Sequence, residues 1–320
     1  MEFQPIERAP GAFQMTVTAD QIRAICHRAF GSGADVVSAV ELGNGMYNST
    51  YRVDIGEERP VILRVAPEPA RQSRIERHLM RNEHASIPYL APIAPLMPRV
   101  LAADFTHQLI GRDYLLQTML DGIPAPKSLG SYPRTQWPGF FRQMGEIARG
   151  IHDVRGAGFG PVARPVFSTW SDAVISFLED SAADLDDVGL DAGDVREVAK
   201  AATKGRALLD EITEPRLLHG DLWTVNVMLA ADSPTPVISG VRVPNATPSG
   251  RPTVRWRTPR PPSGERCSTG LATSAPSGWS ATGWDTPTMC PKPMRRWGKY
   301  LRPHVRLAWS AFTSIVNSQR

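Results

Sequence analysis

Residues 216–246 read RLLHGDLWTVNVMLAADSPTPVISGVRVPNA, and the first half of this stretch decides the fold. A His-Gly pair precedes Asp221, and Asn226 follows that carboxylate five places later. A hydroxyl that attacks a phosphate needs a carboxylate to orient or accept its proton, and a Mg²⁺ ion needs oxygen ligands at a short, fixed distance. The stretch therefore predicts a strand, a loop and a second strand over 216–229, with both side chains on the loop.

This arrangement suits phosphoryl transfer, a reaction that enzymes catalyse mainly by positioning the reactants and stabilising charge. We expect Asp221 to be the catalytic residue that activates the hydroxyl, and Asn226 to hold Mg²⁺ through its side-chain carbonyl. His219 is expected to brace the loop by hydrogen bonding rather than to act as the base.

The chain before this loop predicts a first lobe at 1–120. A T-x-x-Q capping box at Thr18 and Gln21 opens a helix whose apolar residues follow helical spacing. A second helix is predicted over 73–90 from its charge density and apolar spacing. Short runs rich in β-branched and aromatic residues predict five antiparallel strands at 35–42, 49–55, 60–66, 97–105 and 113–120.

The second lobe is predicted at 121–241, beginning with the linker DGIPAPKSLG, and is mainly helical. Two helices are expected near 169–185 and 193–213, joined by an acidic turn that is typical of a solvated loop rather than a metal site. A strongly amphipathic helix is expected over 135–154, with an apolar stripe of Phe140, Phe141, Met144, Ile147, Ala148 and Ile151.

The pattern H-G-D-x-x-x-x-N resembles the catalytic loop of the aminoglycoside phosphotransferase and choline kinase-like family, relatives of the protein kinases. The resemblance covers about residues 18–241 and includes the order of the elements. It implies an α+β, two-lobed protein-kinase-like fold, with ATP and Mg²⁺ as cofactors and a small-molecule hydroxyl as the acceptor. By the same resemblance, the favoured acceptor is an antibiotic such as an aminoglycoside or a macrolide.

The segment LGNGMYNSTYRV, residues 42–53, resembles the family's glycine-rich nucleotide loop. The resemblance implies that Gly43, Gly45 and Asn48 let backbone amides approach the phosphates. A glycine-containing hairpin turn would have the same sequence pattern, so both interpretations stay open at this point.

Two further residues and one segment complete the implied nucleotide side. Arg64 stands on the third predicted strand, where such kinases place a basic residue, and Glu83 in the next helix would pair with it. Protein kinases have Lys at that place, so the arginine is a departure, and an unrelated strand and helix on the surface would be the alternative. The segment YLLQTMLDG resembles the hinge, whose backbone from Gln117 to Met119 would receive the adenine.

The second half of the opening stretch departs from the family. Family members continue into a strand that ends in G-V-I/L-D, and its Asp is the second magnesium ligand. This chain has Arg242 and Val243 at the last two positions, and it carries no acid between Asp232 and Glu265. Loss of a metal-binding carboxylate would raise the reaction barrier by about 3 kcal/mol or more.

Composition changes at the same place. Residues 1–241 hold 23 Lys and Arg against 30 Asp and Glu, a net charge of −7, whereas residues 242–320 hold 13 against 2, a net charge of +11. This basic tail, rich in Pro, Arg and Ser, is predicted not to form a packed core as far as about residue 298. Three explanations stay open: a shifted reading frame, a catalytically impaired pseudokinase that binds nucleotide, and a divergent tail with another metal ligand.

Other function classes fit the sequence poorly. The three cysteines, Cys26, Cys267 and Cys290, are far apart and form no C-x-x-C pair, which argues against a disulfide framework and a zinc site. No long apolar run or signal pattern occurs, so we expect a soluble, cytoplasmic protein without a membrane partner. The tail lacks regularly spaced aromatic residues and known nucleic-acid motifs, so no nucleic-acid partner is expected.

Overall fold

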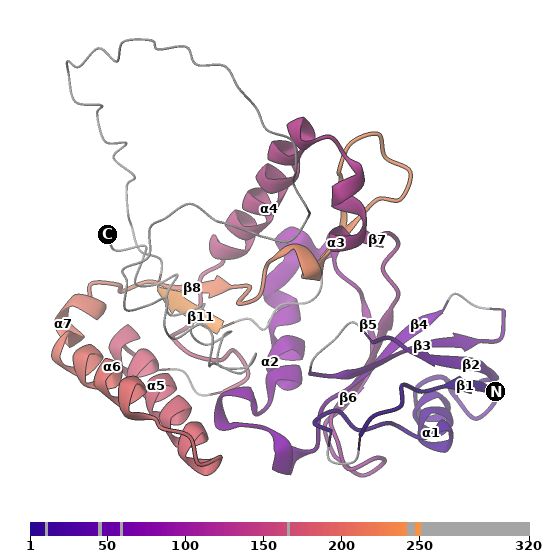
Figure 1. Ribbon diagram of the computed structural model, residues 1–320, viewed down its shortest axis with the longest axis horizontal. Helices are drawn as coiled ribbons and strands as arrows, with labels where there is room; N and C mark the ends of the chain where they lie inside the picture. Colours follow the sequence, from indigo (N-terminus) through magenta and orange to yellow (C-terminus); the bar gives the residue numbers. More distant parts are fainter. Residues whose placement is uncertain (10–11, 44–46, 58–59, 165–166, 242–246, 251–320) are drawn as a thin grey trace, which may run out of the picture. The chain divides into compact units, whose positions relative to one another are not determined.

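The structure is a computed structural model that describes residues 1–9, 12–43, 47–57, 60–164, 167–241 and 247–250. These residues fall within one compact unit, Met1–Arg251 (Figure 1). Gly45, Arg242 and Val243 lie outside the described residues, as does almost all of the basic tail.

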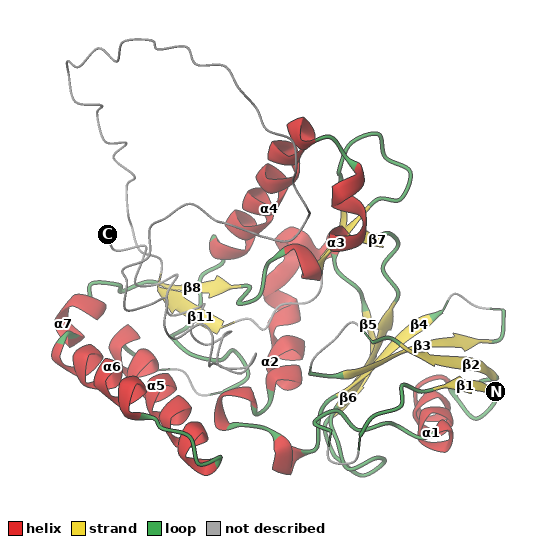
Figure 2. Cartoon of the chain, in the orientation of Figure 1, coloured by secondary structure: helices red, strands yellow, loops and turns green. Residues whose placement is uncertain are grey.

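The five predicted strands of the first sheet, α1 and α4 occur in the predicted order, among further strands and helices (Figure 2). The strands are β1 (Glu2–Gln4), β2 (Val36–Glu41), β3 (Ser49–Ile55), β4 (Val61–Val65), β5 (Val100–Asp104), β6 (Tyr114–Thr118), β7 (Ile123–Pro124), β8 (Pro215–Leu218), β9 (Val227–Leu229), β10 (Ile238–Val241) and β11 (Thr247–Gly250). The α-helices are α1 (Ala19–Phe30), α2 (Leu79–Ser86), α3 (Ala125–Ser128), α4 (Trp137–His152), α5 (Trp170–Asp187), α6 (Gly193–Lys204) and α7 (Arg206–Leu209).

The first lobe is built on a six-stranded sheet in the order β1-β2-β3-β4-β6-β5. The five antiparallel strands predicted from the sequence are all confirmed. The sixth strand, β1, was missed, and it pairs in parallel with β2. A strand of three residues is too short to show an alternating pattern, so no periodicity indicates it in the sequence.

Helix α1 covers one face of this sheet. Its predicted capping box is confirmed, since the Thr18 hydroxyl accepts from the Gln21 backbone and the Gln21 side chain accepts from the Thr18 backbone. Ile22, Ile25 and Cys26 of the helix pack into a core with sheet residues. Burial raises the pKa of the Cys26 thiol to about 11, which keeps it protonated and unreactive.

The single helix predicted over 73–90 is wrong. The chain instead forms two 3₁₀ helices, η2 (Arg74–Glu76) and η3 (Ile87–Leu96). The α-helix α2 lies between them and is shorter than the predicted helix. His78 adopts a left-handed backbone conformation with φ 66° just before α2, and it separates α2 from η2. Prolines within η3 remove amide donors and favour 3₁₀ turns over a continued α-helix.

In the second lobe, α4 confirms the predicted amphipathic helix. Phe140, Ile147 and Ile151 of this helix are buried in the core of the second lobe. Phe141 is 51% exposed and does not belong to the apolar stripe. The helix predicted over 193–213 ends earlier, because α6 stops at Lys204 and the chain turns at Gly205 before α7.

Gly122 lies where the chain passes from β6 to β7, and it has a φ of 136°, a conformation that L side chains rarely adopt. A Cβ atom at this position would lie 2.6 Å from the carbonyl oxygen of Leu229 and 2.5 Å from the hydroxyl oxygen of Ser239. The close approach lets β7 pair with β9, which continues directly from the loop that carries Asp221 and Asn226.

Gly122→Ala is expected to lower the free energy of unfolding by about 2 kcal/mol, because the methyl group adds backbone strain and collides with β9. Urea unfolding followed by circular dichroism measures the change. Gly139→Ala in α4 is the matched control: it has open space around its Cβ and should raise stability by about 0.5–1 kcal/mol. Equal effects of the two variants would contradict the close approach.

Strand pairing continues beyond Val241. β11 pairs antiparallel with β8, with Thr247 opposite Leu218 and Gly250 opposite Pro215. The tail was predicted to lie outside the packed core from residue 242, and this short strand is a difference from that prediction. For 242–246 and 251–320 the prediction concerns residues that the structure does not describe.

Candidate active site

The loop between β8 and β9 carries the residues of the H-G-D-x-x-x-x-N pattern, as predicted. Gly220 has a φ of 77°, a conformation that favours glycine and turns the chain sharply after β8. His219 is 3% exposed, and its Nδ1 accepts a hydrogen bond from the backbone amide of Asp221 at 3.3 Å. This contact confirms that His219 braces the loop.

Asp221 and Asn226 are joined by direct hydrogen bonds. The Asn226 side-chain nitrogen donates to Asp221 Oδ2 at 2.6 Å and to the Asp221 backbone carbonyl at 2.8 Å. Asn226 is 8% exposed and ends a single 3₁₀ turn, η6 (Thr224–Asn226). Because its amide nitrogen is engaged with Asp221, the amide oxygen is the atom of Asn226 that remains to bind a cation.

Arg64 and Glu83 form a two-pronged ion pair between β4 and α2, so the predicted salt-bridge contact is confirmed. Arg64 Nη2 donates to Glu83 Oε2 at 2.9 Å, and Nη1 contacts Oε1. The side chains are 19% and 3% exposed, respectively. A charge pair this deeply buried fixes both side chains, because separating them would leave an uncompensated carboxylate inside the protein.

Strand register places Arg64 and Gln117 on the same face of the sheet. Arg64 lies opposite Leu115 on β6, and residues paired across two strands point to the same face of the sheet. Gln117 is two residues after Leu115, so its side chain points to that face too. Leu63 and Leu116 point to the other face, where they pack with α1. Gln117 is 8% exposed, and its Oε1 has no hydrogen-bond partner within the described part of the chain.

The other residues predicted to bind the nucleotide lie next to strands of the first sheet, but they differ in exposure and hydrogen bonding. Gly43 is exposed at the end of β2 and Asn48 directly precedes β3. The Asn48 carbonyl accepts from Gln14 Nε2 at 2.9 Å, whereas its Oδ1 is buried without a partner among the residues described here. Met119 follows β6 and is 42% exposed.

One group of contacts at this site was missed by the sequence analysis. Asp113, 7% exposed, accepts from Arg81 Nε at 2.9 Å and lies 2.7 Å from His107 Nε2. Arg81 comes from α2, two residues before Glu83. The contacting residues are 32 places apart, and no local pattern reveals a pair at such a distance.

The residues present fit a divalent cation only in part. Asn226 supplies one oxygen, and among the described residues no group of three or more His, Cys, Asp or Glu side chains could hold a metal. Two acids at the end of α5 are bound to arginines: Asp187 pairs with Arg74 and Asp186 with Arg196. Val243, at the place of the family's second ligand, has no side-chain oxygen.

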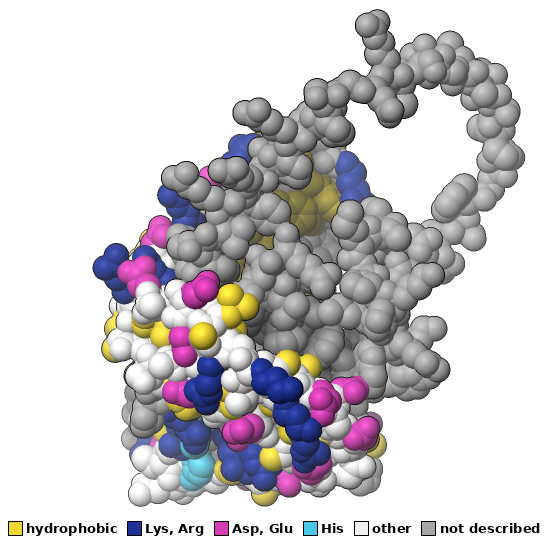
Figure 3. All heavy atoms as spheres, turned by 90° about the vertical axis from the view of Figure 1, so that its left-hand side faces the viewer, with side chains coloured by type: hydrophobic (Ala, Val, Ile, Leu, Met, Phe, Trp, Pro, Cys, Tyr) yellow, Lys and Arg dark blue, Asp and Glu magenta, His cyan; other side chains and the backbone are white. Residues whose placement is uncertain are grey.

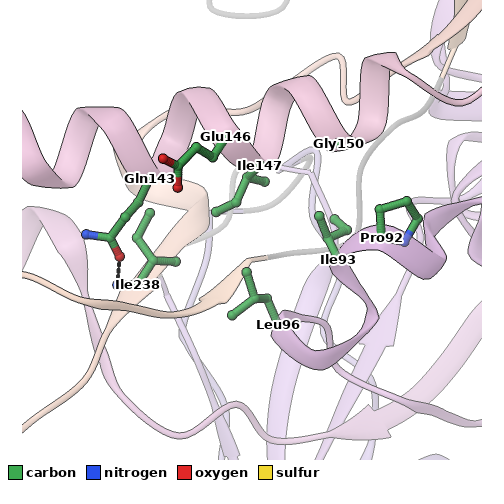
Figure 4. A pocket seen from close by; sticks show the side chains of 8 residues that line it. All are labelled: Pro92, Ile93, Leu96, Gln143, Glu146, Ile147, Gly150 and Ile238. Atoms are coloured by element: carbon green, nitrogen blue, oxygen red, sulfur yellow. Dashed lines mark hydrogen bonds between the residues drawn. The ribbon is translucent and has the colours of Figure 1, made fainter.

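An open pocket of about 320 Å³ lies between α4, η3 and β10 (Figure 4). Gln143 borders it and its Oε1 accepts from the Ile238 backbone amide at 3.0 Å. The other lining residues are mostly apolar, and none belongs to the catalytic loop. This pocket is therefore not the candidate site, because none of the residues predicted to act on the nucleotide or the acceptor lines it.

Charge on the visible surface is mixed. Figure 3 shows the side of the molecule that carries α5, α6 and α7, where basic and acidic side chains lie among one another. Arg206 with Asp172 and Lys200 with Glu197 are examples of such pairs. None of the helices in the described ranges is long and apolar enough to cross a membrane.

Comparison with known proteins gives a family and a set of similar folds. Residues 38–241 match the family described as "Phosphotransferase enzyme family". The crystal structure of aminoglycoside phosphotransferase APH(4)-Ia is similar with a TM-score of 0.50 and 18% identity, over 72% of this chain and 73% of that chain. A thermostable mutant of APH(4)-Ia in its apo form has a TM-score of 0.50 and 19% identity, over 71% and 72%. No curated protein matches the sequence significantly.

At these identities the structural likeness shows the fold alone. The family match, by contrast, covers most of the part of the chain that the structure describes. It ends at Val241, the residue where the composition changes and the expected metal-binding carboxylate fails to follow.

Proposed function

Because the chain belongs to the phosphotransferase enzyme family, we propose that it is an ATP-dependent kinase that phosphorylates a hydroxyl group of a small molecule. The observation that carries the proposal is the hydrogen-bonded pair of Asp221 and Asn226 on the braced loop. These hydrogen bonds support the proposal because phosphoryl transfer requires a proton acceptor, here assigned to Asp221, beside a cation ligand, here assigned to Asn226.

Asp221 orients the acceptor and takes its proton. The acceptor oxygen forms a bond to the γ-phosphorus, the bond from that phosphorus to the β–γ bridging oxygen breaks, and the hydroxyl proton passes to the Asp221 carboxylate. The Asn226 amide, which donates to Oδ2, holds the carboxylate in one orientation. Positioning of this kind lowers the barrier because the reacting groups need not be brought together during the reaction.

Asn226 would hold Mg²⁺ through its amide oxygen. When bound, that ion neutralises charge on the β- and γ-phosphates. Mg²⁺ keeps several water ligands and often takes only one or two from the protein, so a single amide oxygen is a usable but weak anchor.

The nucleotide is assigned to the sheet face that carries Arg64 and Gln117. The guanidinium of Arg64, held by Glu83, faces the α- and β-phosphates, and the backbone from Gln117 to Met119 receives the adenine. Gly43 and Asn48 are assigned to the phosphates as well, together with Gly45, which lies outside the described residues. The side-chain oxygens of Asn48 and Gln117 support this assignment, because both are buried without a hydrogen-bond partner among the described residues and are therefore available to a ligand.

We infer that the acceptor is an antibiotic, such as an aminoglycoside or a macrolide, and that transfer inactivates it. The inference rests on the family and on the similar fold of an aminoglycoside phosphotransferase. The net charge of −7 over residues 1–241 would attract a cationic aminoglycoside.

A second candidate function is a nucleotide-binding protein with little or no turnover. The specific observation in its favour is the sequence itself, which has no acid between Asp232 and Glu265 to complete the metal site. This protein would bind ATP through the same first-lobe residues but transfer phosphate slowly or not at all.

A coupled assay for ADP release distinguishes the two functions. The purified chain is incubated with ATP, Mg²⁺ and a panel of aminoglycosides and macrolides. The kinase proposal predicts ADP release that depends on one class of acceptor and stops when EDTA removes the metal. ATP binding without acceptor-dependent ADP release would favour the second function, and absence of ATP binding would contradict both.

A further inference from the structure

Helix α2 carries Glu83, so whatever fixes this helix also fixes the ion pair with Arg64. The helix has only eight residues, and its N-cap residue, His78, makes no side-chain capping hydrogen bond. Isolated helices shorter than about 12 residues are marginal in water even when their sequence favours helix. The position of α2 must therefore come from its contacts with other elements.

Within the first lobe, Arg81 attaches α2 to the hairpin between β5 and β6. Its guanidinium donates to both oxygens of Asp113, at 2.9 and 2.8 Å, and to the Phe105 carbonyl at 2.8 Å. The hydrogen bonds to Asp113 raise the pKa of Arg81, which keeps the pair charged. This contact fixes one side of the helix to the sheet that carries Arg64.

The second lobe reaches α2 through Asn82. This residue is 4% exposed, and its Oδ1 accepts a hydrogen bond from the backbone amide of Ala163 at 3.0 Å. Ala163 belongs to the segment between α4 and α5. Arg81, Asn82 and Glu83 thus attach one turn of α2 to three places: the hairpin, the second lobe and β4.

A second contact from the second lobe comes from Asp184 of α5. Its carboxylate accepts from the backbone amides of Arg74 at 2.8 Å and Ile75 at 3.2 Å, at the start of η2, and from the Arg74 side chain at 3.1 Å. The Asp184 side chain is 14% exposed. A carboxylate that binds two backbone amides fixes the main chain itself, just before α2 begins.

We propose that Asp184 and Asn82 are positioning residues through which the second lobe sets the place of Glu83 and, through it, of Arg64. The inference rests on the proposed function, because it assumes that Arg64 meets the phosphates of ATP. Neither residue contacts the nucleotide. Each acts on the phosphate contacts only by holding α2.

Asp184→Ala tests the proposal, with Asp186→Ala as the matched control. Both variants remove one carboxylate from the same helix, but Asp186 is exposed and pairs with Arg196 rather than with η2. Calorimetric titration with ATP and Mg²⁺ should give a dissociation constant raised about tenfold for Asp184→Ala and less than about twofold for the control. Amide hydrogen exchange should be faster in α2 of Asp184→Ala, with α4 unchanged.

A double-mutant cycle separates positioning from a general loss of structure. If Asp184 acts through Glu83, then Asp184→Ala should weaken ATP binding in the parent but add almost nothing in a Glu83→Gln background. Additive losses would overturn the proposal, and so would an unchanged dissociation constant in Asp184→Ala. Asp184→Asn, which keeps one acceptor oxygen, should show an intermediate loss and serves if the alanine variant does not fold.

Failure of the proposed function would look different. A parent chain that binds no ATP removes the premise, and the positioning proposal is then overturned together with the assignment of Arg64. A parent that binds ATP with an affinity independent of Asp184 and Asn82 overturns the positioning proposal alone.

Discussion

Asp221→Asn is expected to lower phosphoryl transfer by about 100-fold or more while leaving the dissociation constant for ATP nearly unchanged. The substituted amide keeps an oxygen that accepts from the Asn226 side chain, so the loop geometry should persist. It has no carboxylate to take the acceptor proton, so the chemical step alone should suffer. Asp221→Ala should lose at least as much. Steady-state kinetics of acceptor-dependent ADP release, together with ATP titration, measure the two effects.

Asp232→Ala is the control for this prediction. Asp232 is an exposed carboxylate between β9 and β10, and its removal should change turnover by less than about twofold. Full activity in Asp221→Asn, or equal losses in the two variants, would show that Asp221 does not accept the proton.

Arg64→Met is expected to destabilise the protein by about 3 kcal/mol, because it leaves the Glu83 carboxylate buried without its partner. The variant should also lose most of its affinity for ATP, since the guanidinium is the group assigned to the phosphates. Urea unfolding measures the first effect and ATP titration the second. Arg52→Met on neighbouring β3 is the control: its pair with Asp54 is more exposed, with side chains 46% and 29% exposed, and should contribute less than about 1 kcal/mol.

Combining Arg64→Met with Glu83→Leu separates the two roles of the ion pair. Removing both charges should recover most of the lost stability, because no uncompensated group remains buried. ATP affinity should stay low, since no cation meets the phosphates. If the double variant binds ATP as well as the parent does, the assignment of Arg64 is wrong; if the single variant is as stable as the parent, the pair is not buried as described.

Most of the first lobe could be predicted from sequence because its signals are local. Its five strands alternate or run apolar, and α1 has its capping box. In the second lobe, α4 likewise has its apolar stripe, although Phe141 is exposed. The order of these elements around H-G-D-x-x-x-x-N carried the family resemblance, which the match over 38–241 confirms. That match also ends where the sequence lost the resemblance, at Val241.

What the sequence could not predict depends on contacts between distant residues. The strand β1 is recognisable only beside β2, and the break at His78 comes from a backbone conformation that its sequence neighbours do not require. The hydrogen bonds that Asp184 accepts from the backbone amides of η2 join residues about 110 places apart. The ion pair of Arg64 and Glu83 is predicted by the family resemblance, but the burial of the Glu83 carboxylate depends on the packing of α2, which the sequence does not show.

Mass spectrometry of the acceptor tests the central claim most directly. The parent chain and Asp221→Asn are each incubated with ATP, Mg²⁺ and the acceptor that supports ADP release. The account predicts that the acceptor gains the mass of one phosphoryl group with the parent chain, and that this product falls by about 100-fold with Asp221→Asn. If no antibiotic of the panel gains a phosphoryl group although the parent chain is folded and binds ATP, the claim that this chain transfers phosphate to such acceptors is contradicted.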